Sequence, residues 1–167
     1  HEVLGKEFKV RLEQQYRMHE QIMDFSSRKF YDSALVADPS VAGHMLKDLP
    51  GMKTEGLDET PVVFLDTAGL GYEEEIEEGT ESRYNSQEAK LVVKELNGLL
   101  KAGVPSEEIA IISPYSAQVK LLTGMILGDK SEPGDLASIE IDSVDAFQGR
   151  EKEAVIISLV RSNREGQ

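Results

Sequence analysis

The chain has 167 residues, which predicts one compact domain with a substantial core, and its 40% hydrophobic and 29% charged residues are typical of a globular protein. It contains no cysteine, which excludes disulfides and thiolate metal sites, and its three histidines lack metal-ligand spacing. No apolar run approaches the ~18 residues that span a bilayer, and the charged N-terminal residues do not form a signal peptide. We expect an intracellular domain with no membrane segment.

The net charge of −13 argues against a nucleic-acid partner, since phosphate binding requires positive surface. The charge is unevenly distributed, however. Residues 72–82 carry six glutamates and no lysine or arginine, whereas four acids and four bases balance between residue 143 and the end. We expect the glutamate run to be a solvated loop, so that net charge does not decide the partner.

In the first half of the chain, residues 8–12 predict a strand and residues 19–31 a helix, with Ile22, Phe25, Ser26 and Lys29 on one face. Glycines and prolines in residues 38–60 indicate irregular structure with one short helical turn. The apolar run PVVFLD, residues 61–66, predicts a buried parallel strand. The DTAG that follows from Asp66 is similar to a GTPase switch element, but the phosphate loop and base-recognition motif of a GTPase are absent, which favours a buried strand that ends in a tight turn.

The second half gives clearer signals. Asn85 with Glu88 three residues later predicts a helix start, Val92, Leu96, Leu99 and Leu100 share a face, and Gly103 and Pro105 end the helix. Residues 108–114 predict a central strand, and Ser116 is the expected cap of the next helix, which carries Val119, Leu122 and Ile126. Residues 138–144 and 153–160 predict two more strands. Strands that alternate with helices favour an α/β fold with a mostly parallel sheet.

Three segments carry the candidate functional residues. In LEQQYRMHEQI, residues 12–22, Tyr16 and Arg17 are able to stack on a base and clamp a phosphate, or only to cap a helix end. In IAIISPYSAQV, residues 109–119, polar and aromatic groups follow a buried strand, where open α/β sheets bind ligands, although a plain strand-to-helix turn fits too.

The third segment, IDSVDAFQGREKEAVIISLVRSN in residues 141–163, places Ser, Asp, Gln, Gly, Arg and Glu in one loop between two strands. A glycine lets the backbone approach a phosphate, and a carboxylate accepts hydrogen bonds from ribose hydroxyls. A ligand site and a plain polar turn remain equally open readings of this loop.

Together, in this order and spacing, QYRMH, SPYSAQV and SVDAFQGREKEAVIISLVRSN resemble the second motor domain of Upf-like superfamily 1 helicases. The resemblance extends over nearly the whole chain. It implies that residues 1–167 form the second RecA-like domain, a three-layer P-loop NTPase-type fold with a mostly parallel sheet flanked by helices, ending before the family's last arginine motif. It implies an ATP-dependent motor that moves in the 5′-to-3′ direction on single-stranded DNA or RNA, resident in the cytoplasm or nucleus.

The resemblance also implies residue roles. Tyr16 would lie against the adenine, Arg17 would reach the γ-phosphate as the catalytic arginine, Gly149 would bring backbone close to the phosphates, and Glu151 would hold the ribose. The nucleic-acid contacts would be Ser113, Pro114 and Tyr115, with Ser143, Val144 and Asp145 as the second group.

The sequence holds only half of such a site. It has no GxxxxGK[ST] phosphate loop and no Asp-Glu pair for magnesium, so the Mg²⁺ ligands are expected in the first RecA-like domain of the same parent chain. We therefore expect no ATPase activity from residues 1–167 alone. The alternative function is a non-catalytic protein-interaction module that retains the motor fold.

Overall fold

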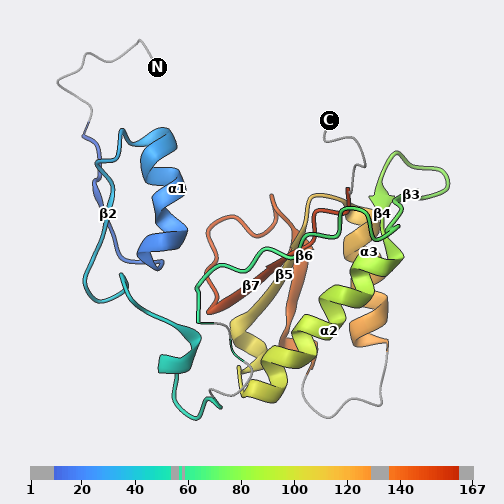
Figure 1. The fold of residues 1–167 in the computed structure, drawn as a ribbon. Coiled ribbons are helices and arrows are strands. Elements are labelled where there is room, and N and C mark those ends of the chain that lie inside the picture. Colours follow the sequence, from blue (N-terminus) through green and yellow to red (C-terminus); the bar gives the residue numbers. More distant parts are fainter. Residues whose placement is uncertain (1–9, 54–56, 58, 129–135, 162–167) are drawn as a thin grey trace. The chain divides into compact units, whose positions relative to one another are not determined.

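The computed structural model of the chain describes residues 10–53, 57, 59–128 and 136–161. The chain forms two compact units (Figure 1). We call residues 1–48 and 58–63 the N-terminal unit, and residues 49–57 and 64–167 the sheet unit. Each is described by itself. No helix in the described ranges is long and apolar enough to cross a membrane.

The N-terminal unit is a small β-α-β arrangement. Strand β1 (Gln14–Gln15) pairs in parallel with β2 (Val36–Ala37), and helix α1 (Glu20–Phe30) connects them. The helix begins at His19, whose Nδ1 accepts a hydrogen bond from the N–H of Gln21 at 3.1 Å. Among the described residues of 38–60, the only helical element is one short 3-10 turn, η2 (Leu46–Asp48). The predicted irregular structure with one short helical turn is therefore confirmed for these residues.

Two details of the N-terminal unit differ from expectation. The strand predicted at residues 8–12 does not form at residues 10–12, and residues 8 and 9 lie outside the described ranges; β1 begins at Gln14, where its partner β2 supplies the hydrogen bonds. On α1, Ile22 and Phe25 are exposed, whereas Met23 and Ser27 are the buried residues. The predicted apolar face therefore does not cover the core of this unit.

The sheet unit is built on three parallel strands in the order β6-β5-β7 (Figure 1). The central strand β5 (Ile109–Ser113) is buried along its whole length, and β6 (Glu140–Ser143) and β7 (Ala154–Ile157) flank it. Helices α2 (Ser86–Ala102) and α3 (Ser116–Leu127) pack on one another, and α3 packs on the sheet. The predicted α/β class, with a parallel sheet and flanking helices, is confirmed.

Short elements complete the sheet unit. Strands β3 (Glu75–Ile76) and β4 (Arg83–Tyr84) form an antiparallel hairpin before α2, and the 3-10 turns η3 (Ser106–Glu108) and η4 (Leu136–Ser138) precede β5 and β6. The core is formed by apolar side chains of α2, β5 and α3. Its fully buried members include Leu96, Ile109, Ile111 and Leu122.

Helix α2 is capped at Asn85 and at Gly103, the two positions that its sequence predicts. The Asn85 side chain accepts a hydrogen bond from the N–H of Glu88 at 3.0 Å. At the other end Gly103 adopts φ +102, and the N–H groups of Gly103 and Val104 donate to the carbonyls of Leu100 and Leu99, both at 3.1 Å. This is a Schellman ending, in which the left-handed backbone requires glycine.

The strand predicted at residues 61–66 is wrong. These residues are all described and form no strand, and the ring of Phe64 is 77% exposed. An apolar run becomes a strand only where a neighbouring strand accepts its hydrogen bonds, and this run instead crosses from the N-terminal unit to the sheet unit. The following DTAG does form a tight turn, in which Asp66 Oδ1 accepts from the N–H of Ala68 at 2.9 Å.

Two smaller expectations also change. Helix α3 is capped at Tyr115, with no side-chain cap bond, and Ser116 is its first residue; the Ser116 hydroxyl donates to Ser82 Oγ at 3.1 Å instead. The glutamate run is mostly exposed as expected, but it is not a plain loop, because Glu75 and Ile76 form β3, and Glu74 is half-buried. Its carboxylate is 19% exposed, pairs with Arg83 at 2.7 Å and lies 3.4 Å from Arg161.

Candidate functional site

The residues predicted to contact nucleic acid converge at one edge of the sheet. Strands β5 and β6 run in parallel with Ser113 opposite Ser143, each the last residue of its strand. The two predicted segments, residues 113–115 and 143–145, therefore begin side by side at the carboxyl edge of the sheet. Ligands of open α/β sheets bind at this edge.

The turn after β5 is held from within. Ser113 is fully buried, and its Oγ accepts a hydrogen bond from the N–H of Tyr115 at 3.3 Å. Pro114 is exposed and Tyr115 half-buried at the start of α3. Ser113 thus acts as a support of the turn, and Pro114 and Tyr115 are the groups of this segment that reach the surface.

In the turn after β6, too, the serine supports the turn and the next two residues reach the surface. Ser143 is half-buried, its carbonyl accepts from the N–H of Phe147 at 3.1 Å, and its hydroxyl accepts from Ala146 at 3.4 Å. Val144 and Asp145 are exposed. The turn therefore presents an apolar and an acidic side chain to solvent, next to the Pro114–Tyr115 surface.

Gln118, a residue to which the sequence prediction gave no role, is fully buried behind these turns. Its Oε1 accepts from the N–H of Asn85 at 2.9 Å, and its Nε2 donates to Ser158 Oγ at 3.0 Å. It therefore ties α3 to the start of α2 and to the end of β7. Its position four residues before the buried Leu122, on an otherwise apolar helical face, is the signal that points to it.

Glu88 completes this buried polar network. A capping box would turn its carboxylate back to the N–H of Asn85, but Gln118 occupies that N–H. The carboxylate accepts instead from Ser158 Oγ at 2.6 Å and from the N–H of Val160 at 2.9 Å. We call Asn85, Glu88, Gln118 and Ser158 the polar clamp.

The polar clamp holds a strained residue. Val160 is fully buried with φ +69, a left-handed conformation that is a genuine outlier for a β-branched side chain and costs about 1–3 kcal/mol. Glu88 binds its N–H, and Asn85 Nδ2 donates to its carbonyl at 3.3 Å. The clamp therefore fixes the direction of the chain after β7, where Arg161 meets Glu74.

The two nucleotide-contact candidates of the sheet unit lie in the loop between β6 and β7. Gly149 has φ +86 and is exposed, with no atom within 4 Å of a Cβ built on it. Arg150 and Lys152 both pair with Glu140, and Lys152 also donates to the carbonyl of Glu107. Gly149 and Glu151 alternate with these anchored residues and are exposed to solvent.

Tyr16 and Arg17 follow β1 in the N-terminal unit, in a turn organised by Gln15. Its Oε1 accepts from the N–H groups of Arg17 at 2.7 Å and Met18 at 2.9 Å, and its Nε2 donates to the carbonyl of Met18 at 2.7 Å. Tyr16 is 65% exposed, and Arg17 is exposed as well. His19 follows this turn and begins α1 through its cap bond.

Asp38 supports this turn from β2. Its Oδ2 accepts from Gln14 Nε2 at 2.7 Å, and its Oδ1 accepts from the hydroxyl of Ser40 at 2.7 Å and from the N–H of Ser40 at 3.0 Å. Hydrogen bonds from Ser40 first, and then from Gln14 and Tyr16, hold the pKa of the Asp38 carboxyl below its ordinary value. Asp38 is therefore ionised and fixed beside the exposed tyrosine.

The structure gathers all six predicted nucleic-acid residues in the sheet unit. The nucleotide candidates are divided between the units, with Tyr16 and Arg17 in one and Gly149 and Glu151 in the other, so each pair is placed only within its own unit. The structure contains a tyrosine and an arginine on one exposed turn, and an exposed glycine and glutamate on another.

The chain is similar to several known proteins. Residues 2–167 match the family described as AAA domain. The chain is 46% identical over 153 residues to "DNA-binding protein SMUBP-2" of Rattus norvegicus, a match that covers 92% of the chain and 15% of the relative. It is 42% identical over 154 residues to "DNA polymerase alpha-associated DNA helicase A" of Schizosaccharomyces pombe, with 89% of the chain and 22% of the relative covered.

A third relative is "Regulator of nonsense transcripts 1 homolog" of Drosophila melanogaster, which is 42% identical over 155 residues, with 92% of the chain and 12% of the relative covered. The chain thus spans less than a quarter of the length of each of these relatives. The match to the family covers nearly every residue, including the three motifs and the strands that carry them. The chain belongs to the AAA domain family, in its Upf-like superfamily 1 helicase branch.

Proposed function

We propose that the chain is the second RecA-like motor domain of an ATP-dependent helicase that moves in the 5′-to-3′ direction on single-stranded DNA or RNA. The observation that carries the proposal is the register of Ser113 with Ser143, since it joins the two predicted nucleic-acid segments at one edge. The relatives described above, which include a DNA helicase and a DNA-binding protein, support it. The expected location of the parent protein is the cytoplasm or nucleus.

The track for the strand is the surface after β5 and β6. Pro114, Tyr115 and Val144 offer apolar and aromatic surface on which bases stack irrespective of sequence, and Ser113, Ser143 and Asp145 shape the turns around them. Backbone N–H groups and helix ends supply contacts to phosphates. Such a surface accounts for nucleic-acid binding by a chain whose net charge is −13, because stacking needs no excess of positive charge.

The chain contributes half of the ATP site. Tyr16 lies against the adenine, Arg17 reaches the γ-phosphate, and Gly149 and Glu151 approach the phosphates and the ribose. These residues fit that use: the ring of Tyr16 and the Glu151 side chain are exposed, and no side chain covers the left-handed backbone at Gly149. The first RecA-like domain of the same parent chain would hold Mg²⁺, which would supply positive charge opposite the phosphates.

An arginine on the γ-phosphate stabilises the charge that develops during phosphoryl transfer. The test is the ATPase activity of the longer parent protein, with and without single-stranded DNA or RNA. We expect strong stimulation by either strand, and a decrease in kcat of about a thousandfold or more for Arg17→Ala. The matched control is Arg28→Ala, which removes an arginine that pairs with Asp24 on the surface of α1.

Each outcome separates the proposals. Normal turnover of Arg17→Ala would reject the role of Arg17 while leaving the motor intact. A folded parent protein with no ATPase activity, stimulated by neither strand, would favour the non-catalytic protein-interaction module. Residues 1–167 alone are expected to hydrolyse no ATP, because the phosphate loop is not in this sequence.

A further inference from the structure

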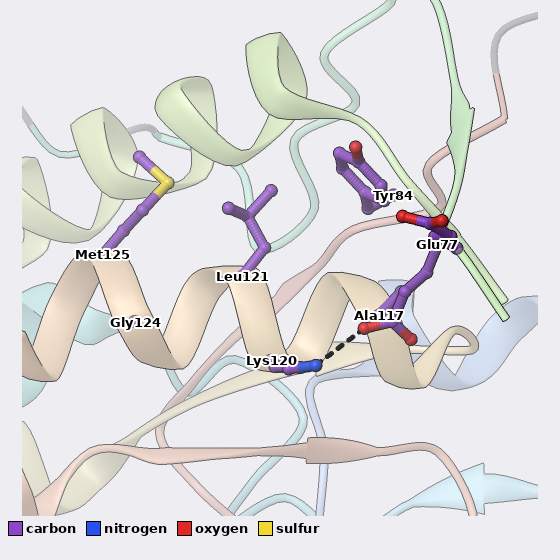
Figure 2. Close-up of a pocket in the computed structure, with 8 residues that line it drawn as sticks. Glu77, Tyr84, Ala117, Lys120, Leu121, Gly124 and Met125 are labelled. Carbon is purple, nitrogen blue, oxygen red and sulfur yellow. Dashed lines mark hydrogen bonds and ion pairs between the residues drawn. The ribbon is translucent and has the colours of Figure 1, made fainter. Parts of the chain in front are cut away.

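A groove lies along α3 in the sheet unit, and its lining shares no residue with the segments 113–115 and 143–145. Its volume is about 500 Å³. Helix α3 forms its floor, and the β3–β4 hairpin forms its rim (Figure 2). The lining residues are Glu77, Glu78, Tyr84, Leu121, Gly124 and Met125, together with Ala117 and Lys120.

The floor of the groove is apolar. Leu121 and Met125 lie four residues apart on α3 and point to the same side of the helix, near Tyr84 of β4 (Figure 2). Gly124 is exposed, and no atom lies within 4 Å of a Cβ built on it, so this position adds open space beside Met125. Methionine adapts its shape to different partners, which suits a binding surface.

The rim of the groove is acidic. Glu77 and Glu78 belong to the run of six glutamates in residues 72–82, which contains no lysine or arginine. Glu77 pairs with Lys120 at 2.8 Å across one end of the groove, so the cation nearest the floor is already neutralised (Figure 2). Because Glu77 and Lys120 cancel one another, the exposed Glu78 gives the rim a net negative charge, which repels nucleic acid and attracts a cationic segment.

We propose that this groove binds a basic peptide segment of a partner protein. An apolar side chain of the peptide packs on Leu121 and Met125, and its lysines or arginines face Glu78 and the other exposed glutamates of the run in residues 72–82. An amphipathic helix laid along a groove is a common form of such recognition. This inference does not depend on the motor function, because the groove shares none of the residues assigned to ATP or nucleic acid.

The test measures the binding of a defined probe to the chain by fluorescence anisotropy. The probe is a fluorescein-labelled peptide of about 14 residues, built of lysines with leucines three and four residues apart. We expect saturable binding that weakens as salt is raised. Replacing the leucines with serine, or the lysines with glutamate, should each weaken binding by about tenfold or more, since apolar and charged contacts are both required.

Two glycines give a matched pair of variants. Gly124→Leu fills the groove and should weaken the peptide's binding by about tenfold. Gly98→Leu, on α2 and likewise with no atom within 4 Å of its built Cβ, should leave binding unchanged. Both changes improve helix propensity, so both variants should fold, which circular dichroism checks. Met125→Gln removes the apolar contact at nearly constant volume and should weaken binding as well.

The proposal is overturned if Gly124→Leu and Met125→Gln bind the peptide as tightly as the unchanged chain. Equal loss in Gly98→Leu would place the peptide elsewhere and overturn it too. Direct binding of a fluorescein-labelled single-stranded DNA that Gly124→Leu abolishes would assign the groove to nucleic acid instead. Failure of the ATPase experiment on the parent protein would leave the peptide result unaffected, so the two proposals fail separately.

Discussion

Ser113 and Ser143 stand opposite one another at the last pair of positions where β5 and β6 are in register. Each serine is followed by exposed residues, Pro114 and Tyr115 on one strand and Val144 and Asp145 on the other. Because parallel strands end at the same edge, two segments thirty positions apart in the chain become neighbours. The sheet, and no local motif, therefore creates the surface proposed for single-stranded nucleic acid.

Tyr115→Ala in the parent protein should weaken its affinity for single-stranded DNA or RNA. Loss of one stacked base costs about 1–3 kcal/mol, which is roughly 5- to 150-fold in affinity. Tyr115→Phe keeps the ring and should bind almost normally. Tyr115 makes no side-chain cap bond to α3, so neither variant should unfold the helix. Equal affinity of all three proteins in a filter-binding or anisotropy titration would remove Tyr115 from the track.

Gly149→Ala should reduce ATPase activity at low ATP concentration more than a glycine change elsewhere. The backbone at Gly149 has φ +86, so alanine there costs about 1–2 kcal/mol of conformational strain and places a methyl group where the phosphates are expected. Gly79→Ala is the control, because Gly79 has φ +79 and the same open surroundings. Both variants should lose similar stability in urea, but only Gly149→Ala should raise KM for ATP. Equal kinetics would contradict the role of Gly149.

Glu88→Ala should destabilise the sheet unit. It leaves the Ser158 hydroxyl and the N–H of the strained, buried Val160 without their acceptor, at a cost of about 1–3 kcal/mol in the free energy of unfolding. Glu95→Ala, on the same helix but with a 40% exposed side chain, should change stability little. Urea denaturation followed by circular dichroism measures both. A Glu88→Ala protein as stable as Glu95→Ala would show that the polar clamp does not hold Val160.

The elements best predicted from sequence are those whose signals are local. Asn85 and Gly103 define the ends of α2 through chemistry within one helical turn, and both positions were predicted. The strand at β5 was predicted because its residues are buried on both faces and so read as one apolar run. Residues 61–66 have the same apolar character but no neighbouring strand, and the sequence does not reveal which runs find a partner.

In the candidate site, too, the locally encoded parts were predicted and the long-range contacts were not. The turns after Ser113 and Ser143 were found because each follows a strand with a distinctive motif. The polar clamp was missed because its hydrogen bonds join the start of α2, α3 and the segment after β7 over as many as 70 positions, and no single segment shows it. From sequence, the Glu88 carboxylate would be expected to accept a hydrogen bond from the nearby N–H of Asn85. In the structure that N–H donates to Gln118, which lies 33 positions along the chain.

The ion pair between Glu77 and Lys120 should make stability depend on pH at both ends of the scale. The hydrogen bond from Lys120 holds the pKa of Glu77 below its ordinary value of 4.5, and Glu77 raises the pKa of Lys120 above 10.5. The depressed carboxyl stabilises the fold above pH 4.5, and this contribution is lost as pH falls through its folded pKa. The raised ammonium stabilises below pH 10.5 and is lost as pH rises through its folded value.

Lys120→Met should therefore lower the Tm most between about pH 4.5 and 10.5, with the difference from the unchanged chain vanishing in acid below the folded pKa of Glu77. Lys120 is exposed and Glu77 is half-buried, so solvent screens the pair, and the effect should be small and should shrink further at high salt. Lys90→Met, which removes an exposed lysine of α2, is the control and should show no such pH dependence. A difference between Lys120→Met and the unchanged chain that stays constant from pH 7 into strong acid would mean that the lysine does not stabilise the fold through Glu77, since methionine keeps the apolar stem of the side chain.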